Sequence, residues 1–556
     1  MNIDPKHLSL LQLLQDRLFQ IPQYQRAYSW GRRQRKELFE DIDALMERDD
    51  GATHFMATVV VLSRGKRTVV TDSFDVVDVV DGQQRLTTLV MLLRSVQKAL
   101  ADLGAHKKAQ ARLNELLIKD DDLSLVLLQT NHDTSHVFRD YIREGKAPAD
   151  GPPSTRAEQN LVQGIRDCEG YAGARDAEGL LKLTQALFNQ LTFIVHTLTD
   201  ESLVYTVFEV LNSRGLSVAW IDKLKSMLMA IAFENGDPDE THVSELHEVW
   251  KEVYRALGLR EGLSDEALRF AAVLLTGQFY KGRLLSLQGA TEAVRDWCGG
   301  DTKKAIEASR WLCTVVEGLN RLGERPVLTP LMRISQARFV ALAIELSDLS
   351  DEDKEACMAQ WEKTVFRVFG IANKDARTLS GALVRLGTKV YRGDMSAASV
   401  VQKLERMAQD KAYGDIRDQL EDENCYHDWK GYLRYLLYRY EQHLAEQEGE
   451  AIDKSVWDRI WAARPDDTIE HIVPQSAANS DGFKGKLYVH RLGNLTLLPP
   501  KVNSSLQDKP FQQKKATYAK APLYQVRALA ELDKWNKKAV KTREEEIISW
   551  VEDQYS

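Results

Sequence analysis

The distribution of hydrophobic residues near the N-terminus constrains the fold most strongly. Residues 54–62 and 74–80 are rich in β-branched side chains and are bounded by turn or polar residues, which predicts two paired strands with a loop at 63–66. After Asp81-Gly82 the apolar residues recur with the spacing of one helix face: Leu86, Leu89, Val90, Leu93, Val96 and Leu100. We expect the first functional site where this strand turns into a helix.

The rest of the sequence predicts a helical middle and a second mixed region. Helical spacing dominates from about residue 103, with breaks at 146–155 and 234–240, and strand-like residues return after Thr468. A chain of 556 residues is long enough for about two to four domains. We therefore expect an α+β multidomain protein with a mixed α/β domain at 1–230, a helical connecting region at 231–405 and a C-terminal domain at 406–556.

Composition indicates a globular protein of a reducing compartment. Hydrophobic residues make up 44% and charged residues 28%, and no apolar run approaches the ~20 residues that span a bilayer. The N-terminal residues lack the order of a secretory signal. The five cysteines are scattered and no pair has zinc-ligand spacing. We expect a cytoplasmic protein without a disulfide framework and without a membrane partner.

Charge is distributed unevenly along the chain. The net charge is −8, which is not typical of a nucleic-acid-binding protein as a whole. Residues 481–543, however, contain 14 Lys or Arg against 4 Asp or Glu. Because phosphate contacts need only a local basic surface, this segment can be a DNA-binding surface. A solvent-exposed basic face without a DNA partner explains the charge equally well.

A group of polar residues in the C-terminal domain has the chemistry of phosphodiester hydrolysis. Glu470 and His471 precede Pro474, Asn494 follows Gly493, and Asn503 comes nine residues later. A neutral imidazole with a pKa near neutrality can take the proton of an attacking water. Oxygen ligands can hold a Mg²⁺ ion that polarises the phosphate. We expect His471 as general base, Asn494 to orient its ring, and Glu470 and Asn503 as metal ligands.

Adjacent strand residues point to opposite faces, so Glu470 and His471 can act together only from an irregular strand end. Gly493 is expected to allow a tight turn between the strands that carry His471 and Asn494. Each of these residues taken alone fits a structural interpretation better: a satisfied histidine, a hairpin, a helix cap at Asn503. Their joint occurrence in this order favours a nuclease site.

The N-terminal half contains a second polar group. Residues 21–30 combine a proline, amides, an arginine and aromatic rings, and residues 81–89 follow a strand directly. Helix N-termini bind phosphate readily. Gly82 permits a phosphate to approach the backbone closely, and Arg85 can form bidentate hydrogen bonds to phosphate oxygens. A third segment, 208–216, adds another arginine beside a glycine. For any one of these segments a turn, an exposed arginine or core aromatics is the simpler interpretation, and no Walker-type loop is present.

The C-terminal motif resembles the HNH (His-Me finger, ββα-metal) nuclease domain of GmrSD-type restriction enzymes. The resemblance rests on residues 470–476, 492–498, Asn503 and the trailing segment 510–518. It implies the same roles for His471, Asn494, Glu470 and Asn503, with glutamate in place of the more common aspartate. Lys514 and Lys515 in the trailing segment are expected to contact DNA.

The N-terminal segments together resemble the ParB/sulfiredoxin-like domain of the same GmrSD/SspE-type proteins, in which the Asp-Gly-Gln-Gln-Arg motif is associated with nucleotide binding and hydrolysis. The resemblance implies that GTP, UTP, CTP or ATP binds here. The expected nucleotide-binding residues are Tyr24, Gln25, Arg26, Asp81, Gly82, Gln83, Gln84, Arg85, Thr87, Asn212 and Arg214.

Together the two resemblances imply a single-chain, modification-dependent (type IV) restriction enzyme of antiphage defence. Its HNH domain would cut double-stranded, modified DNA with Mg²⁺, and the N-terminal NTPase domain would regulate the cut. An assembly of identical chains is compatible with this function. Two alternatives stay open: a nucleotide-driven DNA-binding regulator with a degenerate HNH domain, and a nuclease whose chemistry lies in the N-terminal domain.

Overall fold

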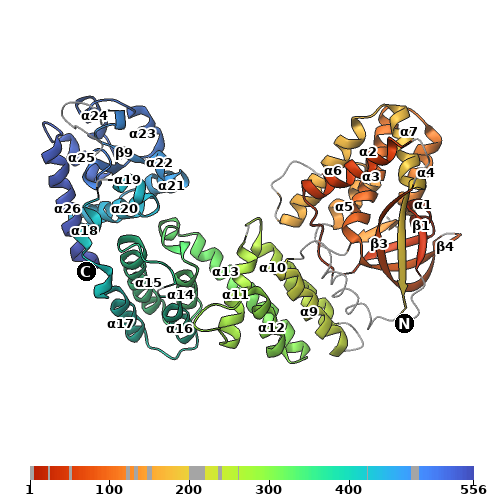
Figure 1. Ribbon diagram of the computed structural model, residues 1–556, viewed down its shortest axis with the longest axis horizontal. Coiled ribbons are helices and arrows are strands. Elements are labelled where there is room, and N and C mark those ends of the chain that lie inside the picture. The colour runs from red at the N-terminus through yellow and green to blue at the C-terminus, as the bar shows by residue number, and fades with distance from the viewer. Residues whose placement is uncertain are drawn as a thin grey trace. The chain divides into compact units, whose positions relative to one another are not determined.

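The computed structural model (Figure 1) describes residues 5–22, 25–48, 53–69, 71–120, 125–130, 135–146, 153, 155–199, 219–235, 241–260, 262–377, 379–422, 424–476 and 488–556. These residues form two compact units. Unit 1 comprises residues 1–268 and 287–316, and unit 2 comprises 269–286 and 317–556. The helical middle of the chain is therefore divided between the two units.

A six-stranded mixed sheet organises unit 1. Its strand order is β1-β8-β3-β4-β2-β7, and β3 pairs antiparallel with β4 and parallel with β8. The strands are β1 (Lys6–Ser9), β2 (Arg17–Ile21), β3 (His54–Val69), β4 (Asp72–Asp81), β7 (Leu128–Thr130) and β8 (Leu191–Leu198). A separate two-stranded sheet joins β5 (Ile118–Asp120) and β6 (Leu125–Val126). The predicted pairing of 54–62 with 74–80 is confirmed.

The loop predicted at 63–66 is wrong, because β3 continues through it to Val69. The register between β3 and β4 shifts at Ser63/Lys66, and Gly65 has a φ of 92°. Glycine adopts this left-handed conformation at little cost, so the strand bulges at Gly65 and then resumes pairing.

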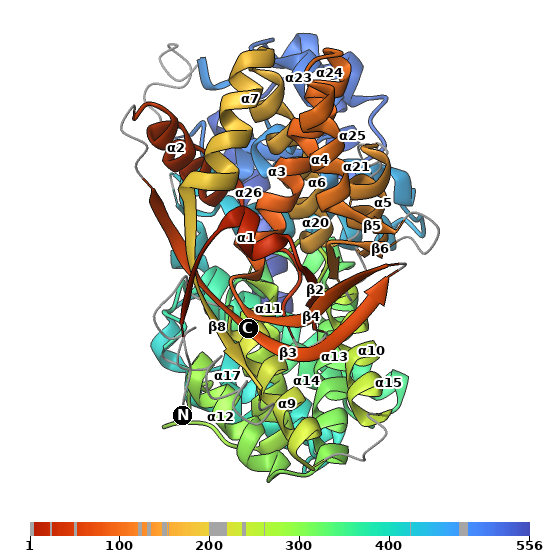
Figure 2. The same cartoon turned by 90° about the vertical axis from the view of Figure 1, so that its right-hand side faces the viewer.

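Helix α3 (Gln83–Asp102) is the centre of the hydrophobic core of unit 1. Most of its side chains are buried, as the apolar spacing predicts, and it packs against α4 (Lys107–Leu117) and α6 (Arg156–Gly173). Figure 2 shows α3 and α6 together on one face of the curved sheet. The other helices here are α1 (Leu10–Leu14), α2 (Arg32–Met46), α5 (Ser135–Glu144), α7 (Ala177–Gln185) and the π-helical η1 (Ala186–Gln190).

The predicted helical middle is confirmed, as is the α+β class. Its α-helices are α9 (Trp220–Asn235), α10 (Thr241–Leu257), α11 (Leu263–Thr276), α12 (Leu287–Cys298), α13 (Thr302–Gly323), α14 (Ser335–Glu345), α15 (Asp351–Val365), α16 (Ser380–Tyr391) and α17 (Ala397–Ala408). Two 3₁₀ helices, η2 (Pro326–Leu328) and η3 (Leu331–Arg333), and the π-helix η4 (Phe366–Ile371) lie between them. Within the described part of the chain, no helix has the length and apolarity needed to cross a bilayer.

The C-terminal part of unit 2 encloses a short hairpin in helices. Strand β9 (Ile469–His471) pairs antiparallel with β10 (Leu495–Leu497), which follows the 3₁₀ turn η7 (Leu492–Asn494). The helices around it are α18 (Ile416–Leu420), α19 (Cys425–Asp428), α20 (Lys430–Gln447), α21 (Lys454–Ala462), α22 (Pro465–Thr468), α23 (Pro500–Leu506), α24 (Phe511–Tyr518), α25 (Tyr524–Ala530) and α26 (Lys537–Tyr555), with η5 (Lys411–Tyr413) before them.

Helix α26 packs directly on the turn η7. A Cβ atom added to Gly493 would lie 2.0 Å from the Val540 carbonyl oxygen and 2.9 Å from Glu544 Cβ. Arg543 donates hydrogen bonds to the carbonyl oxygens of Gly493 and Leu495, which ties this helix to the hairpin. Gly493 is therefore required by the close approach of α26, in addition to any demand of the turn.

We expect Gly493→Ala to lower the free energy of unfolding by about 3 kcal/mol or more, because the added methyl group meets backbone that cannot move aside cheaply. Thermal or denaturant unfolding measures the effect. Gly170→Ala is the matched control, since its Cβ meets nothing within 4 Å on α6. The control should stabilise the helix by about 0.5–1 kcal/mol. Equal effects of the two substitutions would contradict the packing argument.

Candidate active site

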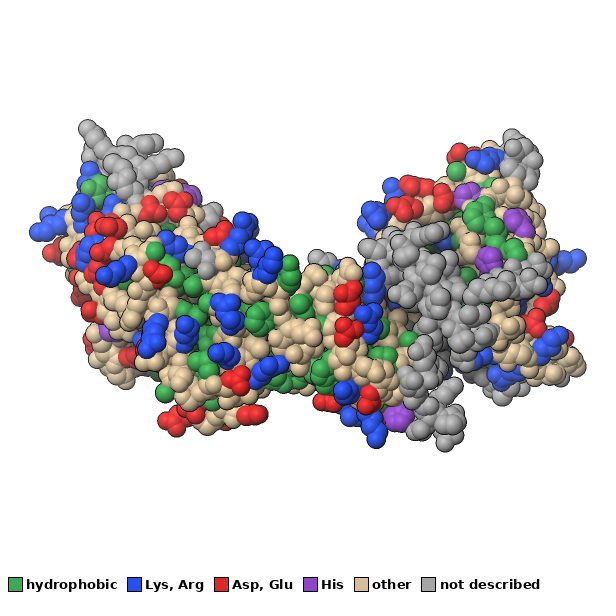
Figure 3. Space-filling view, turned by 60° about the horizontal axis from the view of Figure 1, so that its bottom comes forward, with side chains coloured by type: hydrophobic (Ala, Val, Ile, Leu, Met, Phe, Trp, Pro, Cys, Tyr) green, Lys and Arg blue, Asp and Glu red, His purple; other side chains and the backbone are tan. Residues whose placement is uncertain are grey.

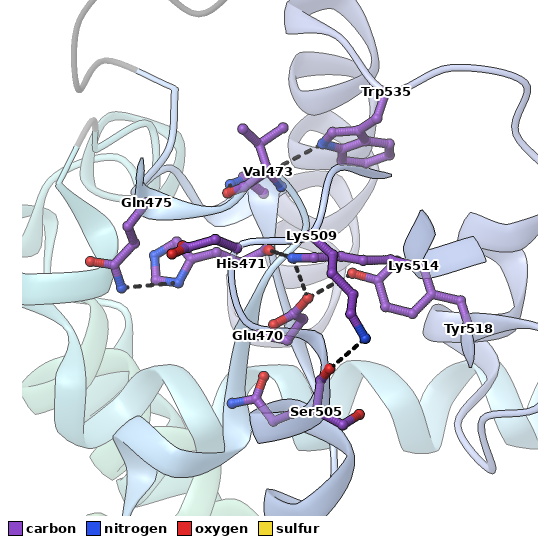
Figure 4. A network of polar contacts seen from close by, with 12 residues as sticks. Glu470, His471, Val473, Gln475, Ser505, Lys509, Lys514, Tyr518 and Trp535 are labelled. Atoms are coloured by element: carbon purple, nitrogen blue, oxygen red, sulfur yellow. Dashed lines mark hydrogen bonds and ion pairs between the residues drawn. The ribbon is translucent and has the colours of Figure 1, made fainter. Parts of the chain in front are cut away.

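His471 is the last residue of β9, and its side chain points away from that of Glu470 (Figure 4). Its Nε2 lies 3.3 Å from His490 Nδ1, and its Nδ1 lies 3.4 Å from the amide nitrogen of Gln475. Tyr426 packs edge-on against the ring, with centroids 4.5 Å apart. His471 is only 6% exposed, whereas Gln475 is exposed. The ring is thus buried on its Nε2 side and reaches the surface on its Nδ1 side.

The environment of His471 favours the neutral imidazole. Burial, reinforced by His490, Lys514 and His427, lowers its pKa to about 3. The sequence-based expectation was a pKa near neutrality, and burial accounts for the difference. We assign the Nε2 proton to the bond with His490 Nδ1, which leaves the lone pair on Nδ1 to accept from Gln475 or from a water.

His490 was missed in the sequence. It is held by the aromatic face of Tyr426, and its carbonyl oxygen accepts from the Tyr426 backbone N–H at 3.0 Å. It lies 19 residues from His471, and no spacing rule links the two. The only local signal was its place four residues before Asn494. His490 has the position that the sequence analysis expected of Asn494, next to the imidazole of the base.

Asn494 instead fixes the backbone on both sides of the site. Its Oδ1 accepts from the Val473 N–H at 2.9 Å and from Trp535 Nε1 at 3.0 Å. Its Nδ2 donates to the carbonyl oxygens of Val473 at 3.1 Å and Val489 at 2.8 Å. Fully buried, this amide joins the chain after His471 to the residue before His490. Asn494 therefore holds the two histidines together through their neighbouring backbone groups.

Glu470 points to α24, where its Oε1 accepts from Lys514 Nζ at 2.7 Å and from the Tyr518 hydroxyl at 2.8 Å. Lys514 also donates to the His471 carbonyl oxygen at 2.7 Å. Burial raises the pKa of Glu470, and Lys514 and Tyr518 oppose that rise. Lys514 is 0% exposed, so its ammonium cannot reach a DNA phosphate. This corrects the expectation of a DNA contact at Lys514, whereas Lys515 is partly exposed and keeps that expectation.

The expected metal ligands fit a cation poorly. A divalent cation on Glu470 would lie beside the Lys514 ammonium, which already neutralises the carboxylate. Asn503, on α23, donates its amide to the Asp467 carbonyl oxygen at 3.0 Å and offers only a neutral oxygen in return. Among the residues that the structure describes, no group of three or more His, Cys, Asp or Glu is suited to a metal ion. Glu470 has the contacts of a positioning residue.

In unit 1, the strand-to-helix junction at Asp81-Gly82 holds the segment that begins at Gln25. Gln84 accepts from the Ser29 and Trp30 N–H groups at 2.7 and 3.3 Å, and its Nε2 donates to the Ala27 carbonyl oxygen at 3.2 Å. Gln25 donates to the Val80 carbonyl oxygen at 2.7 Å. The structure thus brings together the first two of the predicted nucleotide-binding segments.

The remaining predicted nucleotide-binding residues differ in accessibility. Gly82 has a φ of 93° and precedes the first residue of α3. Gln83 and Thr87 are buried, while Asp81 and Arg85 are partly exposed. Burial raises the pKa of Asp81, although the Gly82 N–H, Arg85 and Arg26 oppose the rise. Tyr24, Asn212 and Arg214, together with segment 208–216, lie outside the described residues.

Comparison with protein families gives two matches. Residues 10–229 match the N-terminal domain of the GmrSD restriction endonuclease, and residues 410–550 match the C-terminal domain of GmrSD restriction endonucleases. A search of curated proteins found no match. The matched segments contain the strand-to-helix junction and the His471 site, respectively.

We expect Lys514→Met to destabilise the protein by about 3–5 kcal/mol, because it leaves the Glu470 carboxylate buried without a cation. Denaturant unfolding monitored by circular dichroism measures the change. Lys515→Met is the control at the adjacent, partly exposed position and should change stability by about 0.5 kcal/mol or less. The double variant Glu470→Gln/Lys514→Met should recover part of the loss. A Lys514→Met protein as stable as the control would contradict the role of the ion pair.

Proposed function

Because the chain belongs to the GmrSD-type restriction endonucleases, we propose that it hydrolyses DNA at the His471 site, as an HNH-type nuclease. The observation that carries this proposal is the geometry of His471. Its ring is neutral and held by His490 through Nε2, and its Nδ1 faces the exposed Gln475. A hairpin followed by α23 supports the assignment, because it has the ββα order implied by the sequence motif.

In the proposed reaction, water attacks the phosphorus atom and His471 Nδ1 takes its proton. The bond from phosphorus to the leaving oxygen breaks, and that oxygen takes a proton from solvent. The negative charge of a bound phosphodiester raises the proton affinity of a nearby imidazole, which offsets the depressed pKa of the buried ring. His490 Nδ1 accepts the hydrogen bond from the His471 Nε2–H and keeps the ring oriented throughout.

The positioning residues act through the backbone. Asn494 joins residue 473 to residue 489, and Lys514 binds both the Glu470 carboxylate and the His471 carbonyl oxygen. Since no described acidic cluster fits a metal, no step above depends on one. The Mg²⁺ requirement implied by the sequence stays a prediction. Complete loss of cleavage in EDTA, with recovery on adding Mg²⁺, would establish it, and full activity in EDTA would refute it.

We further propose that the N-terminal domain binds a nucleoside triphosphate and so regulates cleavage of modified DNA in phage defence. The contacts between segment 25–30 and the strand-to-helix junction support a built site. Regulation of this kind needs a coupling free energy of only about 1–3 kcal/mol between the two sites. On the face seen in Figure 3, Lys and Arg side chains lie in separate groups among other side chains.

His471→Ala should abolish DNA cleavage while the protein stays folded, because it removes the imidazole that takes the proton of the water in the proposed reaction. Gel analysis of modified and unmodified plasmids, with circular dichroism for folding, measures both properties. His443→Ala is the control, since this partly exposed histidine packs on Trp550 in the same unit. Unchanged cleavage by His471→Ala would place the chemistry elsewhere, as in the alternative of an N-terminal nuclease.

His490→Leu should lower kcat/KM for DNA cleavage by about 10–100-fold, because it removes the nitrogen that accepts the hydrogen bond from the His471 Nε2–H. His490→Asn should recover most of that loss, because the amide oxygen of the new asparagine can accept the same hydrogen bond. Single-turnover cleavage rates across pH distinguish this role from a purely structural one. If Asn and Leu at this position were equally inactive, or both fully active, His490 would not orient the base.

A further inference from the structure

Unit 1 contains a cavity of about 500 Å³ beside the segment held by Gln84. One wall is formed by the segment from Arg26 to Trp30 and by the start of α6. Gln84, at the junction of β4 and α3, holds this segment by hydrogen bonds. The opposite wall is formed by α9 and α10. A cavity of this size matches ordinary small-molecule sites. Neither the junction residues Asp81 and Gly82 nor Arg85 is among the residues that line it.

The cavity has a strongly positive lining. Among the described residues around it, one carboxylate, Asp222, stands against six cationic side chains: Arg26, Arg33, Arg156, Lys225, Lys251 and Arg260. Lys251 also forms an ion pair at 2.7 Å with Glu248, which is not part of the lining. Asp222 itself accepts a hydrogen bond from the Tyr254 hydroxyl at 2.6 Å. Such a lining favours a ligand with several negative charges, and a triphosphate has them.

Lys225 is the most deeply placed of these cations, at 2% exposure. Its Nζ donates to the Gln25 carbonyl oxygen at 3.4 Å and lies 5.5 Å from the Tyr254 ring. A cation held away from water attracts a phosphate more strongly than a surface lysine does. Lys225 also connects α9 to the segment of the first wall, so both walls contact the same buried ammonium.

Residues of the Asp81–Arg85 motif pack against the segment that lines the cavity. Gln84 fixes the backbone of Ser29 and Trp30, and Arg85 lies over the Trp30 ring at 5.7 Å. Tyr28, whose hydroxyl bonds Thr88 at 2.8 Å, and Trp30 bring aromatic surface to the lining. Both side chains are buried, at 7% and 8% exposure, so they shape the lining and leave little ring surface open.

We propose that the nucleotide binds in this cavity, with its polyphosphate between Lys225 on α9 and Lys251 on α10, and that α10 is an integral wall of the site. Helix α10 lies beyond residue 229, where the match to the family's N-terminal domain ends. The inference rests on the proposed nucleotide regulation and adds the site's second wall. A ligand held in this way joins the sheet domain to the first helices of the middle region.

The test measures binding of fluorescent GTP, ATP, UTP and CTP analogues to the full-length protein. Lys251→Met should weaken the Kd of the preferred nucleotide about tenfold, the usual effect of losing one charge-assisted contact. Arg255→Met is the control, because Arg255 is exposed on the same helix and does not line the cavity. Inorganic tripolyphosphate should displace the nucleotide from the wild-type protein, and the free nucleoside should not.

The outcomes separate the two proposals. If the wild-type protein binds none of the four nucleotides, the proposed nucleotide regulation fails, and this inference fails with it. If it binds a nucleotide and Lys251→Met keeps wild-type affinity, α10 is not a wall of the site, although the regulation stands. Hydrogen exchange provides a second measurement: at a nucleotide concentration near the wild-type Kd, nucleotide should slow exchange of the α10 amides more in wild-type protein than in Lys251→Met. Unchanged exchange in wild-type protein would overturn the inference.

Discussion

Both candidate sites depend on one constraint, which is that a polar side chain removed from water must find its hydrogen-bond partners within the protein. Gln84, Asn494 and the Glu470–Lys514 pair are all buried, and each bonds groups far away in the sequence. Because an unsatisfied buried donor or acceptor costs about 1–3 kcal/mol, each network has essentially one low-energy arrangement. That arrangement sets where His471 and the Arg26 to Trp30 segment lie.

The same constraint explains why motif residues such as Asn494 and Gln84 position the backbone of the sites and do not themselves face a ligand. Asn494 has no amide atom left for the imidazole, and Gln84 uses its amide on the backbone of another segment. The residues with accessible chemistry are their neighbours: the Nδ1 side of His471 and the basic lining of the cavity. Apart from His471, which belongs to the motif and carries the proposed chemistry, the motif positions lie next to the reacting positions and differ from them.

Local patterns predicted what local physics determines. The strand at 74–80, helix α3 and the strand that returns after Thr468 follow from local residue type and spacing. The bulge at Gly65 was taken for a loop because only the partner strand reveals continued pairing. The sequence predicts a DNA contact at Lys514 because a lysine in a basic segment is usually exposed, and its carboxylate partner lies 44 residues away. The cavity draws its lining from residues between 26 and 264, a set that no local pattern brings together.

The reach of the Glu470 side chain has an evolutionary consequence. Its Oε1 lies within hydrogen-bond distance of both Lys514 and Tyr518, and that fit uses the full length of a glutamate. An aspartate, one methylene shorter, would withdraw the carboxylate from α24 and leave the lysine buried without its counter-charge. Positions 470 and 514 are thus expected to change together during divergence. A relative with aspartate at the first position should have a residue other than a buried lysine at the second, or a helix that lies closer to the strand.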